Sequence, residues 1–361
     1  MKSRYSLHLG RPFGIRVSVH WSFTLLIAWI VFISLNRGLE TMQIVMHIIF
    51  VLTLFVCVVL HEFGHSLVAI KFGGKVESIT LLPIGGMANM SKMPEKPREE
   101  FLVSAAGPAV NIVIAILLWL YLHFFHPVEM DDMSFEAITV QNFPPMLLSA
   151  NLFIVIFNLI PAFPMDGGRL FRSALSMKMS RLKATRIARD IGQVFAVLFI
   201  IAGLFINPFL IIIGFFVLLG AKGEHEMIKY QDILKNYTVE DVLKKDYAGL
   251  DAEDTLGKAA EDLVHISDRG FVVTTDGDYA GILTRNDLVK GLSTNGRDGL
   301  VKEVMSTDPE HVDAELPLFE AYVNLRKSRL EIVPVMKNEE FAGILDLENV
   351  NDFLLIQKAV Q

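Results

Sequence analysis

The segment VLHEFGHSLVAIKFGG, residues 59–74, places two histidines and a glutamate directly after a long apolar run. His61 and His65 are four residues apart, so on a helix both imidazoles project from one face and can bind one Zn²⁺ ion. Glu62 lies beside them, where it can accept a proton from a metal-bound water. Residues 44–60 contain no Lys, Arg, Asp or Glu. Because ionisable groups inside a bilayer cost about 3 kcal/mol each and usually serve a function, the segment predicts a metal site within the membrane and not a solvated surface helix.

Other apolar runs surround this segment. Crossing a bilayer takes about 20 apolar residues, and runs near or above that length lie at 17–35, 44–69, 101–125 and 146–160. A fifth run, 191–221, is too long for one straight helix and has Asn207-Pro208 in its middle, which predicts a hairpin of two short spans. We therefore expect a polytopic α-helical membrane domain with six transmembrane helices over residues 1–222, followed by a soluble α/β module.

The charges between these runs predict their orientation. Lys and Arg gather in segments 2–16, 71–98 and 169–189, whereas segment 129–136 has acidic residues and no Lys or Arg. The positive-inside rule then places the first three segments in the cytoplasm and the fourth outside. With six spans, both termini and everything after residue 222 are expected to be cytoplasmic, in a multi-pass protein of the cell membrane.

The composition excludes other classes of protein. The net charge is −7, and no block of Lys and Arg is large enough to neutralise many phosphates, so we expect no nucleic-acid partner. Cys57 is the single cysteine, which excludes a disulfide framework and fits a reducing compartment for the soluble half.

The C-terminal part contains an internal repeat. YAGILTRNDLVKGL at 279–292 matches FAGILDLENVNDFL at 341–354, and the same offset aligns VEDVL at 239–243 with VKEVM at 301–305. A constant offset indicates tandem copies of one unit. Each copy is predicted to contain a short extended entry, a helix, a β-hairpin and a second helix. We expect a linker over 223–237 and copies over 238–295 and 300–357.

A catalytic zinc takes three protein ligands and a water, so one ligand is missing from HEFGH. Asp166 follows the fourth apolar run, at the membrane side where His61 and His65 are expected. Alone, an Asp before Gly167-Gly168 is typical of a turn. Together with HEFGH, it is the expected third ligand.

Four motifs together resemble those of the site-2 protease family of intramembrane zinc proteases, and the repeat resembles a pair of CBS domains. These motifs are HEFGH (61–65), LLPIGGMANM (81–90), SAAGPAVN (104–111) and NLIPAFPMDGG (158–168). The resemblance implies one Zn²⁺ per chain held by His61, His65 and Asp166, with Glu62 as the catalytic carboxylate. It also implies a substrate that is a membrane protein whose transmembrane helix can unwind.

Further site residues follow from the resemblance. Asn158 is at the position of an asparagine that can bind the substrate carbonyl or the oxyanion; the alternative is a helix-packing amide. Pro83, Gly85 and Gly86 are implied to belong to a hairpin that dips into the membrane and pairs with an extended substrate.

In CBS domains that bind adenine nucleotides such as ATP or AMP, residues equivalent to Thr284 and Asp287 contact phosphate and ribose. The second copy has Asp346 and Asn349 instead, and an aspartate would repel a phosphate. We therefore expect one competent nucleotide site. The alternative is a structural pair or one that forms a homodimer.

Two other functions remain open from the sequence. A transporter or channel gated by CBS domains predicts carboxylates scattered along several spans, whereas here they converge on one zinc-like set. An inactive membrane scaffold is disfavoured because Glu62 and all three expected ligands are present.

Overall fold

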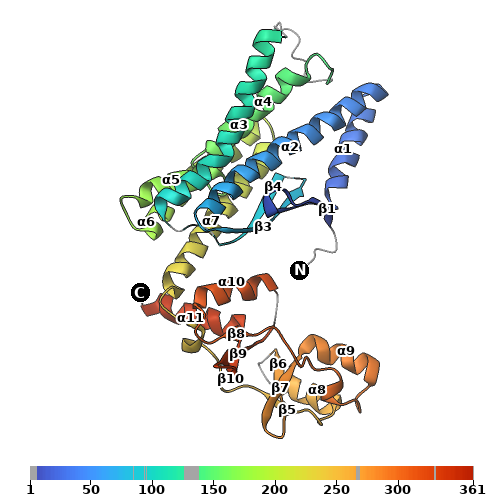
Figure 1. Cartoon of the computed structure of the whole chain (residues 1–361), viewed down its shortest axis with the longest axis vertical. Helices are drawn as coiled ribbons and strands as arrows, with labels where there is room; N and C mark the ends of the chain where they lie inside the picture. Colours follow the sequence, from blue (N-terminus) through green and yellow to red (C-terminus); the bar gives the residue numbers. More distant parts are fainter. Residues whose placement is uncertain are drawn as a thin grey trace. The chain divides into compact units, whose positions relative to one another are not determined.

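The computed structural model describes residues 6–83, 85–92, 94, 96–125, 138–265, 269–328 and 331–360. The chain divides into two compact units, Met1–Glu226 and Met227–Gln361 (Figure 1). The acidic segment 129–136, expected to face outside, lies outside the described residues, as do Lys2 and Arg4.

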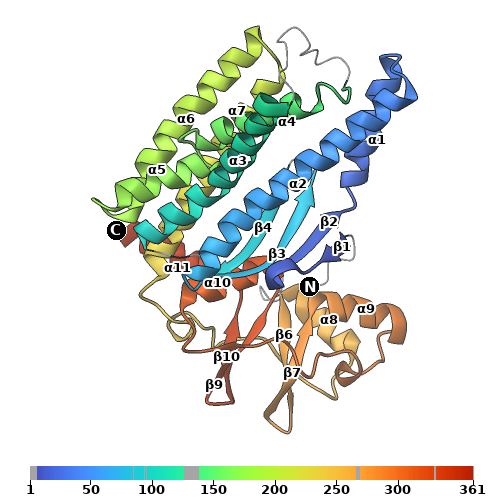
Figure 2. The ribbon, with the colours of Figure 1, turned by 45° about the horizontal axis from the view of Figure 1, so that its top comes forward.

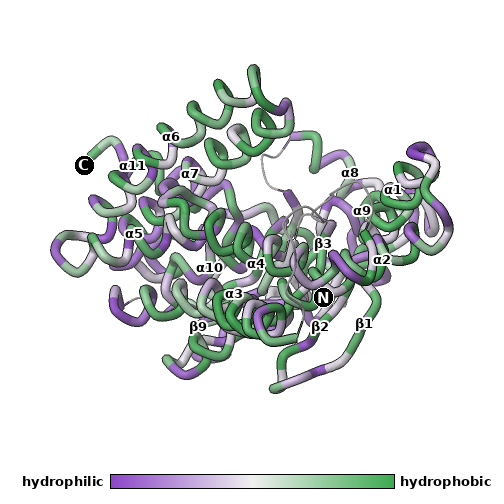
Figure 3. The backbone as a smooth tube through the Cα atoms, turned by 90° about the horizontal axis from the view of Figure 1, so that it is seen from above, coloured by the Kyte–Doolittle hydropathy of each residue, from purple (hydrophilic) through white to green (hydrophobic). Residues whose placement is uncertain are grey.

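Seven helices are described in or beginning in the first unit: α1 (Phe23–Asn36), α2 (Thr41–Lys71), α3 (Pro97–Phe125), α4 (Phe143–Leu159), α5 (Asp166–Ser176), α6 (Arg181–Phe205) and α7 (Phe209–Leu234). Helices α2, α3 and α6 are long and apolar enough to cross a membrane, and α1 and α4 are shorter apolar helices. Hydrophobic residues run along much of α3 and α6 (Figure 3). The unit is therefore a helical membrane domain with three candidate spans among its described residues.

The start of the first apolar run differs from the prediction of one span over 17–35. Residues Arg16–His20 form strand β2, and the helix begins only at Phe23. Val17 is buried against Ile15 and Ile79 in a small apolar cluster. The prediction failed because a β-branched, alternating stretch such as RVSVH becomes a strand when a partner strand is available.

The partner strands complete a sheet in the order β1-β2-β3-β4, with β1 over Ser6–Gly10, β3 over Lys75–Leu82 and β4 over Gly85–Lys92. A 3-10 turn, η1 (Pro12–Gly14), joins β1 to β2. Strand β2 pairs parallel to β3, and β3 pairs antiparallel to β4. Figure 2 shows β3 and β4 alongside α2. Strand β4 is thus an edge strand beside the helix that carries HEFGH.

The break predicted at Asn207-Pro208 is confirmed. Helix α6 ends at Phe205, α7 begins at Phe209, and the Asn207 Oδ1 accepts a hydrogen bond from the Phe209 N–H at 2.9 Å. Proline cannot donate a hydrogen bond within a helix, so the chain turns here.

Residues 169–189 differ from the prediction. They were expected to form a loop but lie largely in α5 and α6.

The second unit contains the two copies of the repeat. The first has β5 (Gly249–Asp251), α8 (Leu256–His265), β6 (Gly270–Thr275), β7 (Asp278–Thr284) and α9 (Arg285–Asn295). The second has β8 (Val312–Asp313), α10 (Leu318–Ser328), β9 (Val333–Lys337), β10 (Glu340–Leu345) and α11 (Leu347–Val360). Short 3-10 turns, η3 (Val239–Asp241) and η4 (Val301–Glu303), stand near the start of each copy. The predicted helix, hairpin and second helix therefore occur in both copies.

The two copies exchange backbone pairs reciprocally. Lys244 of the first bridges Ile344 of the second, and Ser306 of the second bridges Ile282 of the first. Tyr279 and Phe341, at matching positions of the two copies, stack at 4.3 Å between ring centroids. Because a residue of each copy pairs with the edge strand of the other copy, the two copies form one module.

The segment expected as a linker, 223–237, is largely helical. Helix α7 continues to Leu234, and Ile233 and Leu234 are buried in the core of the second unit.

Candidate metal centre

Two helices bring together the three predicted ligands. Helix α2 carries His61 and His65 on one face, and Asp166 is the first residue of α5. The Asp166 Oδ2 lies 3.2 Å from the His61 Nε2 and 3.1 Å from the His65 Nε2, and the two Nε2 atoms are 3.1 Å apart. Both histidines are buried, at 5% and 7% exposure. Two imidazoles and one carboxylate are the donor set of a catalytic zinc site, so these residues fit the expected ion.

Helix α3 orients both imidazoles. The His61 Nδ1–H donates to the Asn111 Oδ1 at 2.6 Å, and the His65 Nδ1–H donates to the Val103 carbonyl at 2.7 Å. Each ring therefore keeps the lone pair of Nε2 directed toward Asp166, as metal-binding histidines require. The sequence analysis gave Asn111 no role, although a polar residue within an apolar span was a signal that could have found it.

A glycine keeps this space open. Gly107 of α3 lies against both rings, and a Cβ added there would stand 2.7 Å from the His61 Nε2 and closer still to the His65 ring. Any side chain at this position would occupy the space in front of the two donor nitrogens.

The predicted catalytic carboxylate lies between α2 and the edge strand. Glu62 follows His61 on α2, and a Cβ added at Gly86 of β4 would lie 2.8 Å from the Glu62 Cγ. Pro83 stands in the turn of the β3–β4 hairpin, and Gly85 pairs with Leu82 at the start of β4. The structure thus brings the start of β4 against Glu62.

Asn158 lies in the last turn of α4, partly exposed. Its side chain makes no hydrogen bond with the four described residues His61, Glu62, His65 and Asp166. Sequence proximity to Asp166 therefore does not translate into a hydrogen bond between these side chains.

The turn before α5 is tightly packed. Ala162 and Phe163 are fully buried, the Phe163-Pro164 peptide bond is cis, and Gly168 leaves no room for a Cβ against the Ala162 backbone. The burial of Ala162 and Phe163 and the close approach of Gly168 fix the position of Asp166 at the start of α5.

A buried arginine anchors the rest of α5. Arg172 is 1% exposed, pairs with Glu100 of α3 and with Glu224 of α7 at 2.6 Å, and lies over the Phe163 ring. Arg181 at the start of α6 lies 3.5 Å from Glu100. Arg172, which the sequence placed in a cytoplasmic loop, therefore joins α3, α5 and α7. The helix that begins with Asp166 is held in place by these ion pairs.

The predicted nucleotide residues occupy the start of a helix. Thr284 caps α9, its Oγ1 accepting from the Asp287 N–H at 3.2 Å and donating to the Asp287 Oδ2 at 2.6 Å. At the matching position of the second copy, Asp346 is 7% exposed and accepts from the Asn349 N–H at 2.8 Å. The acidic side chain is therefore three residues after the cap in the first copy and at the cap itself in the second.

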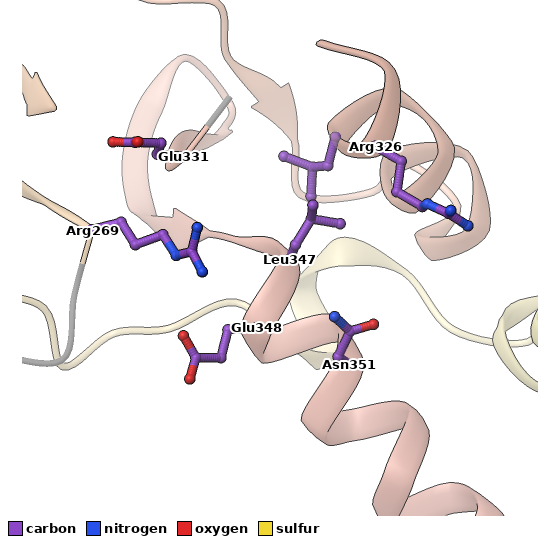
Figure 4. Close-up of a pocket in the computed structure, with 7 residues that line it drawn as sticks. Arg269, Arg326, Glu331, Leu347, Glu348 and Asn351 are labelled. Atoms are coloured by element: carbon purple, nitrogen blue, oxygen red, sulfur yellow. The ribbon is translucent and has the colours of Figure 1, made fainter. Parts of the chain in front are cut away.

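A cavity of about 520 Å³ opens in the second unit (Figure 4). Its lining combines two arginines with two glutamates: Arg269, Leu325, Arg326, Glu331, Leu347, Glu348 and Asn351. Neither Thr284 nor Asp287 is among these residues, but the two residues between them bond to the lining: the Arg285 N–H donates to the Arg269 carbonyl, and the Asn286 Nδ2 donates to the Glu331 Oε1.

Comparison with known proteins gives two families. The model of peptidase family M50 matches residues 49–127 and 123–201, and that of the CBS domain matches 239–294 and 301–356. The chain is 34% identical over 304 residues to zinc metalloprotease MJ0392 of Methanocaldococcus jannaschii, which covers 83% of each chain. It is 28% identical over 370 residues to the protein sll0528 of Synechocystis sp., covering 96% of this chain and 94% of that one.

A solved structure, the site-2 protease from Methanocaldococcus jannaschii, is 40% identical, covers 61% of this chain and 95% of its own, and has a TM-score of 0.45. The resemblance carried by the four motifs and the repeat is confirmed by the two family models and by the relative that matches most of the chain. The chain therefore belongs to peptidase family M50, the site-2 protease family of zinc metalloproteases, and carries a tandem pair of CBS domains.

Proposed function

We propose that His61, His65 and Asp166 hold the single zinc of this metalloendopeptidase and that Glu62 is its general base. The observation that carries this assignment is the convergence of three ligand atoms from two helices within 4.8 Å of one another. The arrangement also argues against a transporter or channel, because the acidic and basic ligands meet at one point. When bound, the ion would polarise the scissile carbonyl and lower the pKa of its water.

The chain's own residues would then transfer the proton from the attacking water to the leaving amine. A Glu62 carboxylate oxygen accepts a proton from the water that attacks the peptide carbonyl, and the same carboxyl returns it to the departing amine nitrogen. The bonds of His61 and His65 to α3 hold their donor nitrogens toward Asp166 throughout. Asn158 would donate a hydrogen bond to the carbonyl oxygen of the substrate.

The substrate is a transmembrane segment of a membrane protein. A helix hides its carbonyls in its own hydrogen bonds, so the segment must unwind before it can be cleaved. An unwound strand can pair with the free edge of β4, at Gly85 and Gly86, next to the turn at Pro83. The approach of Gly86 to Glu62 would place a strand bound there beside the general base.

We also propose a six-span topology with both termini and the CBS pair in the cytoplasm. The apolar character of α1 and α4 and the break between α6 and α7 support it. Single cysteines at Glu129→Cys and Lys183→Cys, in a Cys57→Ala background, can be probed with an impermeant reagent in intact cells. Labelling of Glu129→Cys alone is expected; labelling of Lys183→Cys would overturn the topology.

The CBS pair would bind one adenine nucleotide, ATP or AMP, through Thr284 and Asp287, and regulate proteolysis. A route for this regulation is α7, which carries Glu224 and continues into the second unit, because Glu224 pairs with Arg172 of the helix that begins with Asp166. Calorimetry on the full chain should show one nucleotide per chain, lost in Asp287→Ala. Absence of binding at millimolar nucleotide would leave a structural or homodimer-forming pair.

The protease assignment is tested by zinc content and cleavage together. Wild-type protein should contain about one zinc per chain by elemental analysis, and His61→Ala should lose it. Glu62→Gln should keep the zinc and lose cleavage of a membrane-protein substrate about 10³-fold, because an amide cannot accept the water's proton. Cleavage by Glu62→Gln at more than a few per cent of wild type would refute its role as base.

A further inference from the structure

A chain of side-chain amides leads from His61 across three helices. Asn111 of α3 accepts from the His61 Nδ1–H at 2.6 Å, and its Nδ2 donates to the Asn151 Oδ1 of α4 at 2.8 Å. The Asn151 Nδ2 donates in turn to the Leu147 carbonyl at 2.8 Å, with the Cys57 Sγ 3.6 Å away as a second acceptor. Both asparagines are fully buried. The path therefore ends on backbone that carries no catalytic group.

The end of the path fixes the direction of every bond in it. A backbone carbonyl can only accept, so Asn151 must turn its NH₂ toward Leu147 and its oxygen toward Asn111. Asn111 then presents its own NH₂ to that oxygen and its own oxygen to His61. Because an amide oxygen cannot donate, the His61 proton must sit on Nδ1, which leaves the lone pair on Nε2.

A single hydrogen bond, to the Val103 carbonyl, fixes the same tautomer in His65. A backbone carbonyl cannot be reversed, whereas a side-chain amide can rotate and present NH₂ where oxygen is needed. Asn111 alone would therefore not specify the His61 tautomer. Its orientation needs a second partner, and Asn151 is that partner.

We propose that Asn151 is a positioning residue of the metal centre: it fixes the orientation of Asn111 and, through it, the tautomer of His61. This inference rests on the proposed zinc site. Asn151 makes no hydrogen bond to the three proposed ligands, so its effect must pass through Asn111.

The test is the zinc affinity of the full-length, metal-free protein in detergent, measured by competition with a chelator. Asn111→Leu should weaken zinc binding 10–100-fold, as loss of an outer partner does elsewhere. Asn151→Leu should weaken it about 10-fold, because Asn111 can then rotate. The double variant Asn111→Leu/Asn151→Leu should bind no more weakly than Asn111→Leu, because both changes act on one path.

A rescue variant separates orientation from packing. A carboxylate presents an oxygen whichever way it turns, so Asn111→Asp no longer needs Asn151 to orient it. Asn111→Asp/Asn151→Leu should therefore bind zinc within about 3-fold of wild type. A loss of packing at Asn151 would not be repaired by a change at Asn111.

Asn142 provides the matched control. It is also a buried asparagine, and its Oδ1 accepts from the Thr139 N–H at the start of α4, away from the amide path. Asn142→Leu should lower the unfolding temperature of the metal-free protein without changing its zinc affinity. If Asn151→Leu binds zinc as wild type does, or if Asn111→Asp does not rescue it, the inference is wrong. If wild type itself binds no zinc, the proposed function fails instead.

Discussion

The two units differ in how many polar side chains they bury. Among the described residues, every buried polar or charged side chain except Asp346 lies in the first unit. The exposed large hydrophobic side chains lie there too, apart from Val264, Val289, Leu355, Ile356 and Val360 in the second unit. The second unit thus follows the usual rule of apolar core and polar surface, whereas the first buries polar side chains beside its apolar clusters and exposes large apolar side chains.

This difference in buried side chains shows that different interactions stabilise the two units. Lipid tails are as apolar as leucine, so apolar burial alone does not drive the helices of a membrane unit together. Close backbone approach and polar bonds take that role, as at Gly64 against the Ala106 carbonyl and at Arg172 between two carboxylates. In the second unit, apolar clusters that include Phe271, Leu283 and Leu325 supply the stabilisation.

The largest expected effect concerns the buried carboxylate of the first unit. Asp166→Ala should weaken zinc binding more than about 100-fold, exceeding the loss expected from an outer partner, because it removes an anion that faces both imidazoles. Chelator competition measures it. Asp190→Ala, an aspartate on α6 paired only at the surface with Arg189, is the control and should bind zinc normally. Unchanged affinity in Asp166→Ala would make Asp166 a turn residue and not a ligand.

The second effect concerns the buried ion pairs. Arg172→Met should lower the free energy of unfolding by about 3 kcal/mol, because Glu100 loses its closest cation, although Arg181 still lies 3.5 Å from it. Unfolding in detergent at increasing denaturant measures this.

Two controls sharpen that prediction. The triple variant Arg172→Met/Glu100→Gln/Glu224→Gln should recover most of the loss, because none of these three positions then carries a charge. Arg189→Met, which breaks an exposed pair, should change the free energy of unfolding by less than about 1 kcal/mol. An equal loss in both single variants would mean that burial does not distinguish the two ion pairs.

A smaller effect is expected in the apolar core of the second unit. Ile282 and Ile344 occupy matching positions of the two copies, are fully buried and pack in one cluster. Ile282→Val and Ile344→Val should each cost about 1 kcal/mol of unfolding free energy and leave zinc content unchanged. Costs that differ by more than about 1 kcal/mol would show that the copies are not equivalent in their core.

The last prediction concerns a shifted titration in the second unit. Burial against Phe341, with a lesser contribution from the charge of Asp308, raises the pKa of Tyr279 to about 12, above its usual 10.0. The folded state holds this proton more tightly than the unfolded state. Its contribution to stability is therefore complete below pH 10 and is lost as the pH rises toward 12. Phenolate absorbance should show one late step that Tyr279→Phe removes; ionisation of Tyr279 near pH 10 would contradict this.

The sequence by itself determined the features that depend on neighbours along the chain. The four-residue spacing of HEFGH places His61 and His65 on one face of α2, because a helix turns every 3.6 residues. The offset between the repeats predicted two equivalent copies, and Asn207-Pro208 predicted the break before α7. Asp166 was reached less directly, from the ligand count of zinc and the expected side of the membrane.

Only the tertiary structure decided the features that depend on distant partners. Residues 17–20 form a strand because β3, more than fifty residues later, offers backbone hydrogen bonds to them. Arg172 is buried because Glu100 and Glu224, on two other helices, neutralise it. Asn111 and Asn151 bond to each other from different helices, and sequence spacing carries no information about such a pair. Hydrogen bonds and ion pairs act over a few ångströms in space, whatever the separation along the chain, so the fold alone decides which polar groups meet.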